Sequence, residues 1–76
     1  MSEAFKAGKY HAETDRPSNL SFYTKGTFAW FDYLEGQQAG YNELLWSERR
    51  HGMILKAEEY EAKRDAVKAI LKEAGR

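Results

Sequence analysis

The chain contains a single proline, Pro17, and no run in which Val, Ile or Thr alternates with polar residues. Because such alternation is the main signal of a half-buried strand, its absence argues against a sheet. Helix-forming residues dominate the rest of the 76 residues. The sequence therefore predicts an all-α protein, folded as one small domain over residues 1–76, since a chain of this length supports only a small core.

Capping and turn residues divide this chain into a bundle of three to four helices. Ser2 has the position of an N-cap, and Pro17 lies in a turn-rich segment that ends the first helix. Thr24 or Thr27 is expected to cap the next helix, and Lys56 to occupy the N-cap position of the last. The predicted helices cover, approximately, residues 2–13, 27–39, 41–51 and 56–74.

Two glycines, Gly36 and Gly40, lie one turn apart in the middle of the predicted helical region. Each costs about 1 kcal/mol relative to Ala inside a helix, so their presence needs a reason. Either a break falls there, as the boundary between residues 39 and 41 assumes, or a neighbouring helix passes close. Ala4, Gly8 and Ala12 share one ridge of the first helix and are the expected partner for such a close approach.

Eight of the eleven aromatic side chains fall within residues 22–46. Most are expected in the core, yet a chain that buries only about 60% of its unfolded surface cannot hide all of them. Exposed aromatic surface usually marks a protein partner, and interface energy concentrates in Trp, Tyr and Arg. The predicted partner-binding residues are Phe22, Tyr23, Trp30, Tyr33, Tyr41 and Trp46, with Arg49 and Arg50 as a polar rim.

Charge and composition exclude several classes of protein. Twelve Lys and Arg balance twelve Asp and Glu, whereas a protein that coats nucleic acid needs a one-sided field. Residues 27–46, which carry most of the aromatic side chains, contain three acids and no Lys or Arg, so this surface repels phosphate. With no cysteine, disulfides, thiolate metal sites and thiol nucleophiles are also excluded.

No catalytic or metal-binding pattern is present. His11, Glu13 and Asp15 do not share a helical face at their spacing, and match no established ligand pattern. Ser47 and His51 lie one turn apart, as a nucleophile and its base would, but no oxyanion feature accompanies them. We therefore expect a protein that is not an enzyme and takes no metal or cofactor.

The first half of the chain resembles the ribosome modulation factor family of small two-helix proteins. The resemblance covers residues 4–40 and rests on Gly8, Ala12, Asn19, Gly26, Tyr33, Gly36 and Ala39. It implies a helical fold and, by extension, association with the ribosome or RNA. Two departures put the RNA binding in doubt, because Leu20 stands where that family has Pro and the basic excess of its ribosome-binding members is missing.

The second half, from Leu44 to Leu71, resembles the short oligomerisation module known as SHOCT. The matching features are a pair of leucines, a glycine turn and an acidic step, formed by Leu44, Leu45, Gly52, Met53, Ile54 and residues 58–63. One residue is extra between the glycine and the acidic pair. This resemblance implies a helical hairpin that self-associates or tethers.

These observations predict a small regulatory protein that docks on a larger protein partner, of the kind that phages and mobile elements use as inhibitors or adaptors. A ribosome- or RNA-associated factor is the first alternative, and a self-assembling structural module is the second. The charged start lacks the apolar stretch of a signal peptide, and no window has the apolar length of a membrane span. We expect a cytoplasmic protein without a membrane partner.

Overall fold

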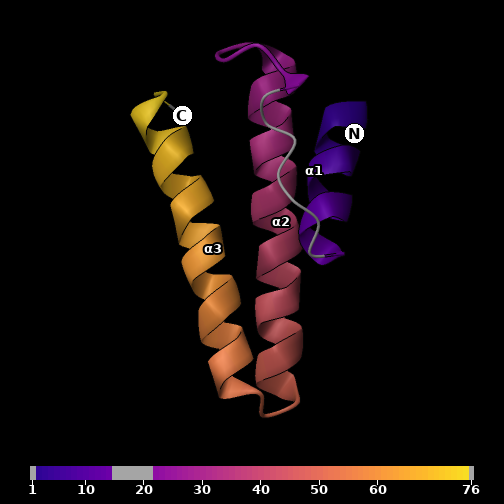
Figure 1. Ribbon diagram of the computed structural model, residues 1–76, viewed down its shortest axis with the longest axis vertical. Helices are drawn as coiled ribbons and strands as arrows, with labels where there is room; N and C mark the ends of the chain where they lie inside the picture. Colours follow the sequence, from indigo (N-terminus) through magenta and orange to yellow (C-terminus); the bar gives the residue numbers. More distant parts are fainter. Residues whose placement is uncertain (1, 15–21, 76) are drawn as a thin grey trace.

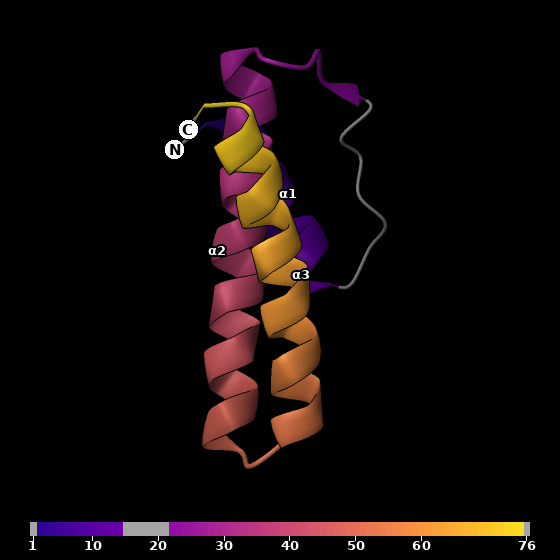
Figure 2. The same ribbon diagram turned by 90° about the vertical axis from the view of Figure 1, so that its left-hand side faces the viewer.

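The computed structural model describes residues 2–14 and 22–75, and every regular element within them is helical. The helices are α1 (Glu3–Glu13), α2 (Phe28–Arg50) and α3 (Ile54–Glu73). α2 contacts both of the others, whereas α1 and α3 do not contact each other. The helices therefore form a single layer with α2 in the middle (Figures 1 and 2). The prediction of an all-α fold is confirmed, with three helices.

The predicted break near Gly40 is wrong, because α2 continues through Gly36 and Gly40 for 23 residues. The predicted helices 27–39 and 41–51 are two halves of this one helix. The alternative reason for the glycines holds instead, since a neighbouring helix passes close. Both glycines are buried on the side of α2 that faces α1.

The contact between α1 and α2 leaves no room for side chains at its centre. A Cβ atom on Gly8 would collide with the backbone carbonyl of Tyr33, and one on Gly36 would collide with that of Phe5. At Gly40 a Cβ would lie 2.8 Å from the Lys9 carbonyl oxygen. The two backbones thus pack against each other directly, and the helices run parallel (Figure 1).

Caps fix the beginnings of the first two helices. The Ser2 hydroxyl accepts a hydrogen bond from the Phe5 N–H, and the Thr27 hydroxyl accepts one from the Trp30 N–H. These caps confirm the predictions for Ser2 and, of the two threonines, for Thr27. The predicted turn at residues 14–19, with Pro17, lies mostly outside the described residues.

α3 begins two residues earlier than predicted and runs antiparallel to α2. Its N-cap is Met53, which makes no side-chain cap, so the prediction of Lys56 as N-cap is wrong. The earlier start follows from the tight turn, in which Gly52 adopts a φ of 75° and the Met53 N–H bonds to the Glu48 carbonyl. Ala57, in the first turn of α3, is consequently buried against α2.

The main core lies between α2 and α3. It is formed by Trp30, Leu34, Val67 and Leu71, with Tyr23, Phe31, Tyr41 and Ala74 packed around it. Residues 22–27 lie on one side of the helical layer, where Tyr23 packs against Tyr33 with ring centroids 5.1 Å apart. On the other side, to the left in Figure 2, no other helix covers α2, and the end of the chain reaches this side only near the first turns of α2.

Candidate functional site

One face of α2 is covered only in part by the neighbouring helices. At 100° per residue, one side of α2 carries a line of six side chains, none of which is buried. Phe28, at one end, is 85% exposed and Trp46, at the other, is 50% exposed. We call this line the open face, and its residues are Phe28, Phe31, Glu35, Ala39, Asn42 and Trp46.

The centre of the open face is the floor of a groove between α3 and α1. A hollow of about 800 Å³ lies between Glu35 and Gln38 of α2 and the α3 residues Lys68 and Lys72. A second hollow, of about 370 Å³, shares Glu35, Gln38 and Lys68 with the first and reaches Phe5 of α1. The two hollows therefore form one continuous groove along α2.

The ends of the open face border two further hollows. Phe28 and Phe31 line one of about 430 Å³, together with Gly26, Thr27 and Gly75. At the other end, Asn42 and Trp46 line one of about 640 Å³, which Arg50 and Glu43 also border. Side chains of the open face thus line all four hollows, from one end of α2 to the other.

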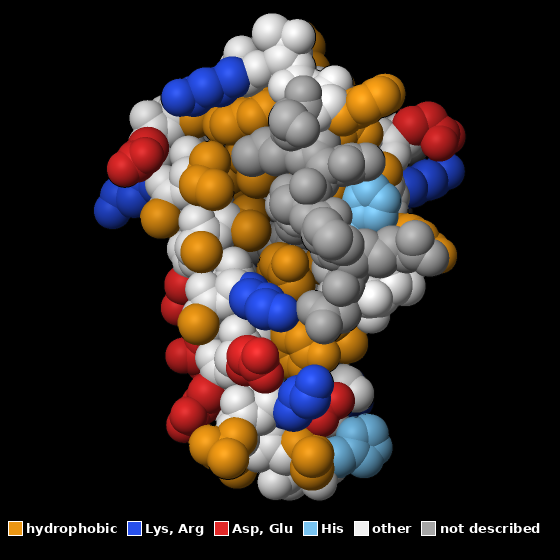
Figure 3. Space-filling view, viewed as in Figure 1, with side chains coloured by type: hydrophobic (Ala, Val, Ile, Leu, Met, Phe, Trp, Pro, Cys, Tyr) orange, Lys and Arg blue, Asp and Glu red, His pale blue; other side chains and the backbone are white. Residues whose placement is uncertain are grey.

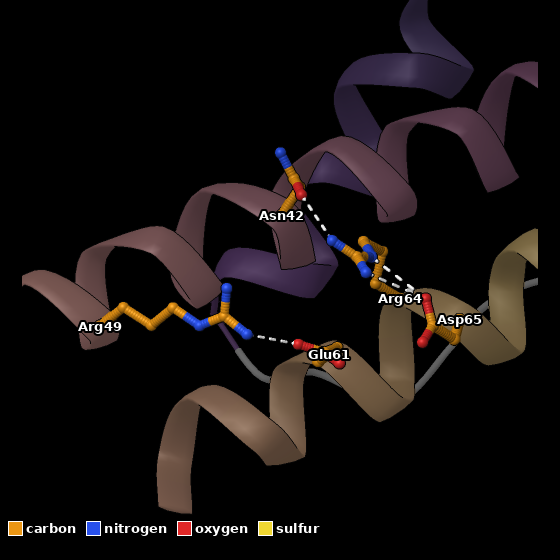
Figure 4. A network of polar contacts seen from close by, with 5 residues as sticks. All are labelled: Asn42, Arg49, Glu61, Arg64 and Asp65. Atoms are coloured by element: carbon orange, nitrogen blue, oxygen red, sulfur yellow. Dashed lines mark hydrogen bonds and ion pairs between the residues drawn. The ribbon is translucent and has the colours of Figure 1, made fainter. Parts of the chain in front are cut away.

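Two arginines tie α2 to α3 (Figure 4), and one of them, Arg64, lines the groove. Arg64 donates hydrogen bonds to the Asn42 side-chain oxygen at 3.0 Å and to the Asp65 carboxylate at 3.1 Å. Nearer the turn, Arg49 donates to the Glu61 carboxylate at 2.6 Å. These contacts fix the guanidinium groups in place, so neither arginine is available without breaking a link between the helices.

Lys68 and Lys72 differ from the arginines because they form no ion pair within the described part of the chain. They lie one turn apart on α3, and both line the larger hollow. The α3 wall of the groove therefore presents two ammonium groups whose charge is not neutralised by a direct partner.

The predicted partner-binding residues are divided between core and surface. Trp30 and Tyr33 are 4% and 0% exposed, so their side chains lie in the interior and not on the exposed surface. Both point from α2 into its contacts with the neighbouring elements, and the Tyr33 hydroxyl lies 2.7 Å from His11 Nδ1. Tyr23 and Tyr41 are half-buried against the core.

Phe22, Trp46, Arg49 and Arg50 are exposed, as predicted, but they do not form one surface. Phe22 packs edge-on against Tyr23 in the segment before α2, whereas Trp46 lies near the far end of that helix. The Arg49 guanidinium lies 5.1 Å from the centre of the Trp46 ring, and Arg50 lines the same hollow as Trp46. Of these four residues, Trp46 belongs to the open face, and Arg49 and Arg50 lie at its border beside Trp46.

Sequence reasoning missed the lysines and Phe28. Phe28 is 85% exposed, and of Phe28, Phe31 and Leu34 the structure buries Leu34 alone. A signal was available in the sequence, because Phe28, Glu35 and Asn42 repeat every seven residues and mark one side of a helix. No sequence pattern marks Lys68 and Lys72 in this way, because they lie beside α2 only when α2 and α3 fold into a hairpin.

Ser47 and His51, which have the spacing of a nucleophile and its base, contact each other through the main chain. His51 Nδ1 contacts the backbone carbonyl of Ser47 at 2.8 Å, so this ring nitrogen faces the main chain and not the Ser47 hydroxyl. Among residues 2–14 and 22–75, no three His, Asp or Glu side chains are grouped so as to hold a metal ion. Over the same residues, no helix has the length and apolar character needed to cross a membrane.

Comparisons with protein families, with curated proteins and with solved structures return no match for this chain. The resemblances to the ribosome modulation factor family and to SHOCT therefore stay predictions.

A charged cluster joins the lower end of α1 to α2. Lys9 Nζ lies 3.1 Å from the Glu43 carboxylate and 3.7 Å from that of Glu13. Hydrogen bonds from Lys9 and Glu13 lower the pKa of Glu43. Burial raises the pKa of Glu13, and the hydrogen bond with Glu43 raises it further. The fold thus favours the ionised form of Glu43 and the protonated form of Glu13.

These opposite shifts predict opposite effects of two substitutions. At pH 7 we expect Glu43→Gln to lower the free energy of unfolding, because a group with a lowered pKa stabilises the fold while it is ionised. We expect Glu13→Gln to raise it, because a group with a raised pKa stabilises the fold only while it is protonated. Both differences should shrink towards pH about 3, where carboxyl groups become protonated. Urea unfolding at the two pH values measures this, and equal effects of the same sign would contradict it.

Proposed function

We propose that this protein is a non-enzymatic regulator or adaptor that docks on a larger protein through the open face of α2. The observation that carries this proposal is the exposure of Phe28 and Trp46 at the two ends of a groove that runs along α2. Large exposed aromatic side chains are costly to leave in water, and they are the residues on which interface energy concentrates. Ala39, between them, allows a partner to approach closely.

The polar rim supports the same assignment. Arg50 borders the Trp46 end, and the central floor carries Glu35 and Asn42. This mixture of apolar and polar groups agrees with a non-obligate interface, which as a whole is about as apolar as the rest of a protein surface. A protein partner therefore fits this face better than a small molecule, because the hollows are open and spread along the helix.

A capture experiment with paired variants tests this proposal. The full chain, immobilised, is exposed to lysate from its native cell, and bound proteins are quantified by mass spectrometry. We expect Phe28→Ser with Trp46→Ser to reduce capture of the specific partner at least about tenfold, since two anchors are removed. Both residues are exposed, so the variant should stay folded by circular dichroism.

The matched control carries the same change at a different apolar surface. Met53 and Leu55 are exposed at the turn between α2 and α3, where Figure 3 shows hydrophobic side chains at the lower end of the molecule. Met53→Ser with Leu55→Ser should leave capture unchanged. If the control loses the partner and the open-face variant keeps it, docking occurs at the turn and the proposal is wrong.

A further inference from the structure

We infer that the occupant of the groove is a single amphipathic α-helix of the partner, with acidic side chains along the flank that faces α3. This inference rests on the proposed function and specifies the kind of element that the open face binds. A bound helix would lie along α2 on the side that α1 and α3 leave uncovered. It would convert the layer of three helices into a four-helix arrangement.

The shape of the groove favours a helix over an extended segment. From Phe28 to Trp46 the open face is straight and about 27 Å long, which matches a helix of about 18 residues. A peptide that binds by β-strand addition needs a sheet edge to pair its backbone N–H and C=O groups, and residues 2–14 and 22–75 contain no strand. A helix satisfies its own backbone hydrogen bonds and can be recognised by side chains alone.

The distribution of bulk along the floor also fits a helix. The aromatic side chains stand at the two ends, and the small side chain of Ala39 lies between them. A straight helix can therefore approach most closely at Ala39 and place apolar side chains against Phe28 and Trp46 at its ends. Phe5, on the α1 side, adds an apolar wall opposite the lysines.

The charges on the α3 side of the groove determine which flank of the bound helix is acidic. Lys68 and Lys72 line the α3 side and have no ion-pair partner within the described residues, whereas Arg64 already binds Asn42 and Asp65. Glu or Asp side chains one turn apart on the partner helix would pair with the two ammonium groups. A phosphate backbone is a poorer match, because it carries a charge on every nucleotide and cannot keep these charges away from Glu35 and Asp65, which line the same hollow, whereas a helix can confine its acidic side chains to the flank beside the lysines.

A second copy of the chain, packed antiparallel, is also a poorer occupant. If two copies packed by their open faces in an antiparallel two-fold arrangement, α3 would lie over α3. Lys68 lies level with Gln38, near the middle of the open face, so it would face the same lysine of the other copy. Like charges at an interface oppose association.

Selection from a peptide library tests the inference without knowledge of the partner. The probe is a phage-displayed library of helical peptides of about 20 residues, which have about the length of the open face. Selected against the full chain, the peptides should carry apolar residues at spacings of three, four and seven, and acidic residues one turn apart on one flank. Binding should be lost in the Phe28→Ser, Trp46→Ser variant.

A charge reversal supplies the decisive comparison. Lys68→Glu with Lys72→Glu should weaken a selected acidic peptide at least about tenfold, and replacing that peptide's acidic flank with lysines should restore binding. Lys25→Glu with Lys56→Glu is the matched control, because these exposed lysines lie outside the groove, and it should leave affinity unchanged.

Several results would overturn the inference. These are selected peptides that are basic or non-helical, binding that ignores the charge reversal, a dimer in light scattering that the open-face variant abolishes, or binding of single-stranded RNA that the same lysines control. If the cellular partner is lost in the open-face variant but retained after charge reversal, docking stands and the acidic helix is wrong. If the open-face variant keeps the partner, the proposed function itself fails.

Discussion

Replacing Gly36 with alanine is expected to destabilise this protein, although the same change stabilises most helices. Removing a glycine from a helix interior normally gains about 1 kcal/mol. Here the added Cβ would strike the backbone carbonyl of Phe5, which cannot move aside as a flexible side chain would. Forcing extra atoms into a tight contact costs about 1–3 kcal/mol, so we expect the free energy of unfolding to fall in urea titrations.

Two further variants calibrate this expectation. Ala66→Gly, on the exposed side of α3, measures the helix-propensity term in this chain and should cost about 1 kcal/mol. Gly8→Ala should resemble Gly36→Ala, and the double variant should cost less than the sum, since α1 can be displaced only once. A gain in stability for Gly36→Ala would show that α1 does not pack on α2 by backbone contact.

The second large loss of stability is expected on truncation of Tyr33. This side chain is fully buried, and it contacts Tyr23 and His11 of α1. Truncation of a buried aromatic side chain costs about 3–5 kcal/mol, which approaches the whole stability expected of a chain of this size. We therefore expect Tyr33→Ala to be unfolded or nearly so at 25 °C by circular dichroism.

Two further variants separate the contribution of the Tyr33 hydroxyl from that of its buried ring. Tyr33→Phe removes only the hydroxyl that contacts His11 and should cost about 1 kcal/mol. Trp46→Ala, at a half-exposed site, should cost less than Tyr33→Ala by at least about 2 kcal/mol. Equal losses at Tyr33 and Trp46 would mean that Trp46 is a core residue, which would weaken the case for the open face.

The contact between α1 and α2 was predictable because small residues at a spacing of four have few other uses. Ala4, Gly8 and Ala12 were matched correctly to Gly36 and Gly40. The break near Gly40 was predicted wrongly for a related reason. Helix propensity penalises glycine locally, but the close packing that glycine permits is a tertiary gain that no local measure contains.

The assignment of aromatic side chains to core or surface was only partly predictable. α2 carries apolar residues on several sides, so its sequence does not show which side α3 covers. Trp30 and Tyr33 are predicted from the sequence as partner-binding residues, and the structure buries both. Phe28, which is not among the predicted partner-binding residues, is exposed. The groove depends on side chains about thirty residues apart in the chain, such as Glu35 and Lys68, that only the hairpin brings together.

The one-sided attachment of α1 has a consequence for local stability. α1 contacts α2 and not α3, while α2 and α3 are joined by a three-residue turn and share the main core. Opening of α1 therefore breaks a single interface and leaves the hairpin core in place. Amide protons of α1 should exchange with solvent through this partial opening, faster than those at the centre of α2, which require the whole molecule to unfold.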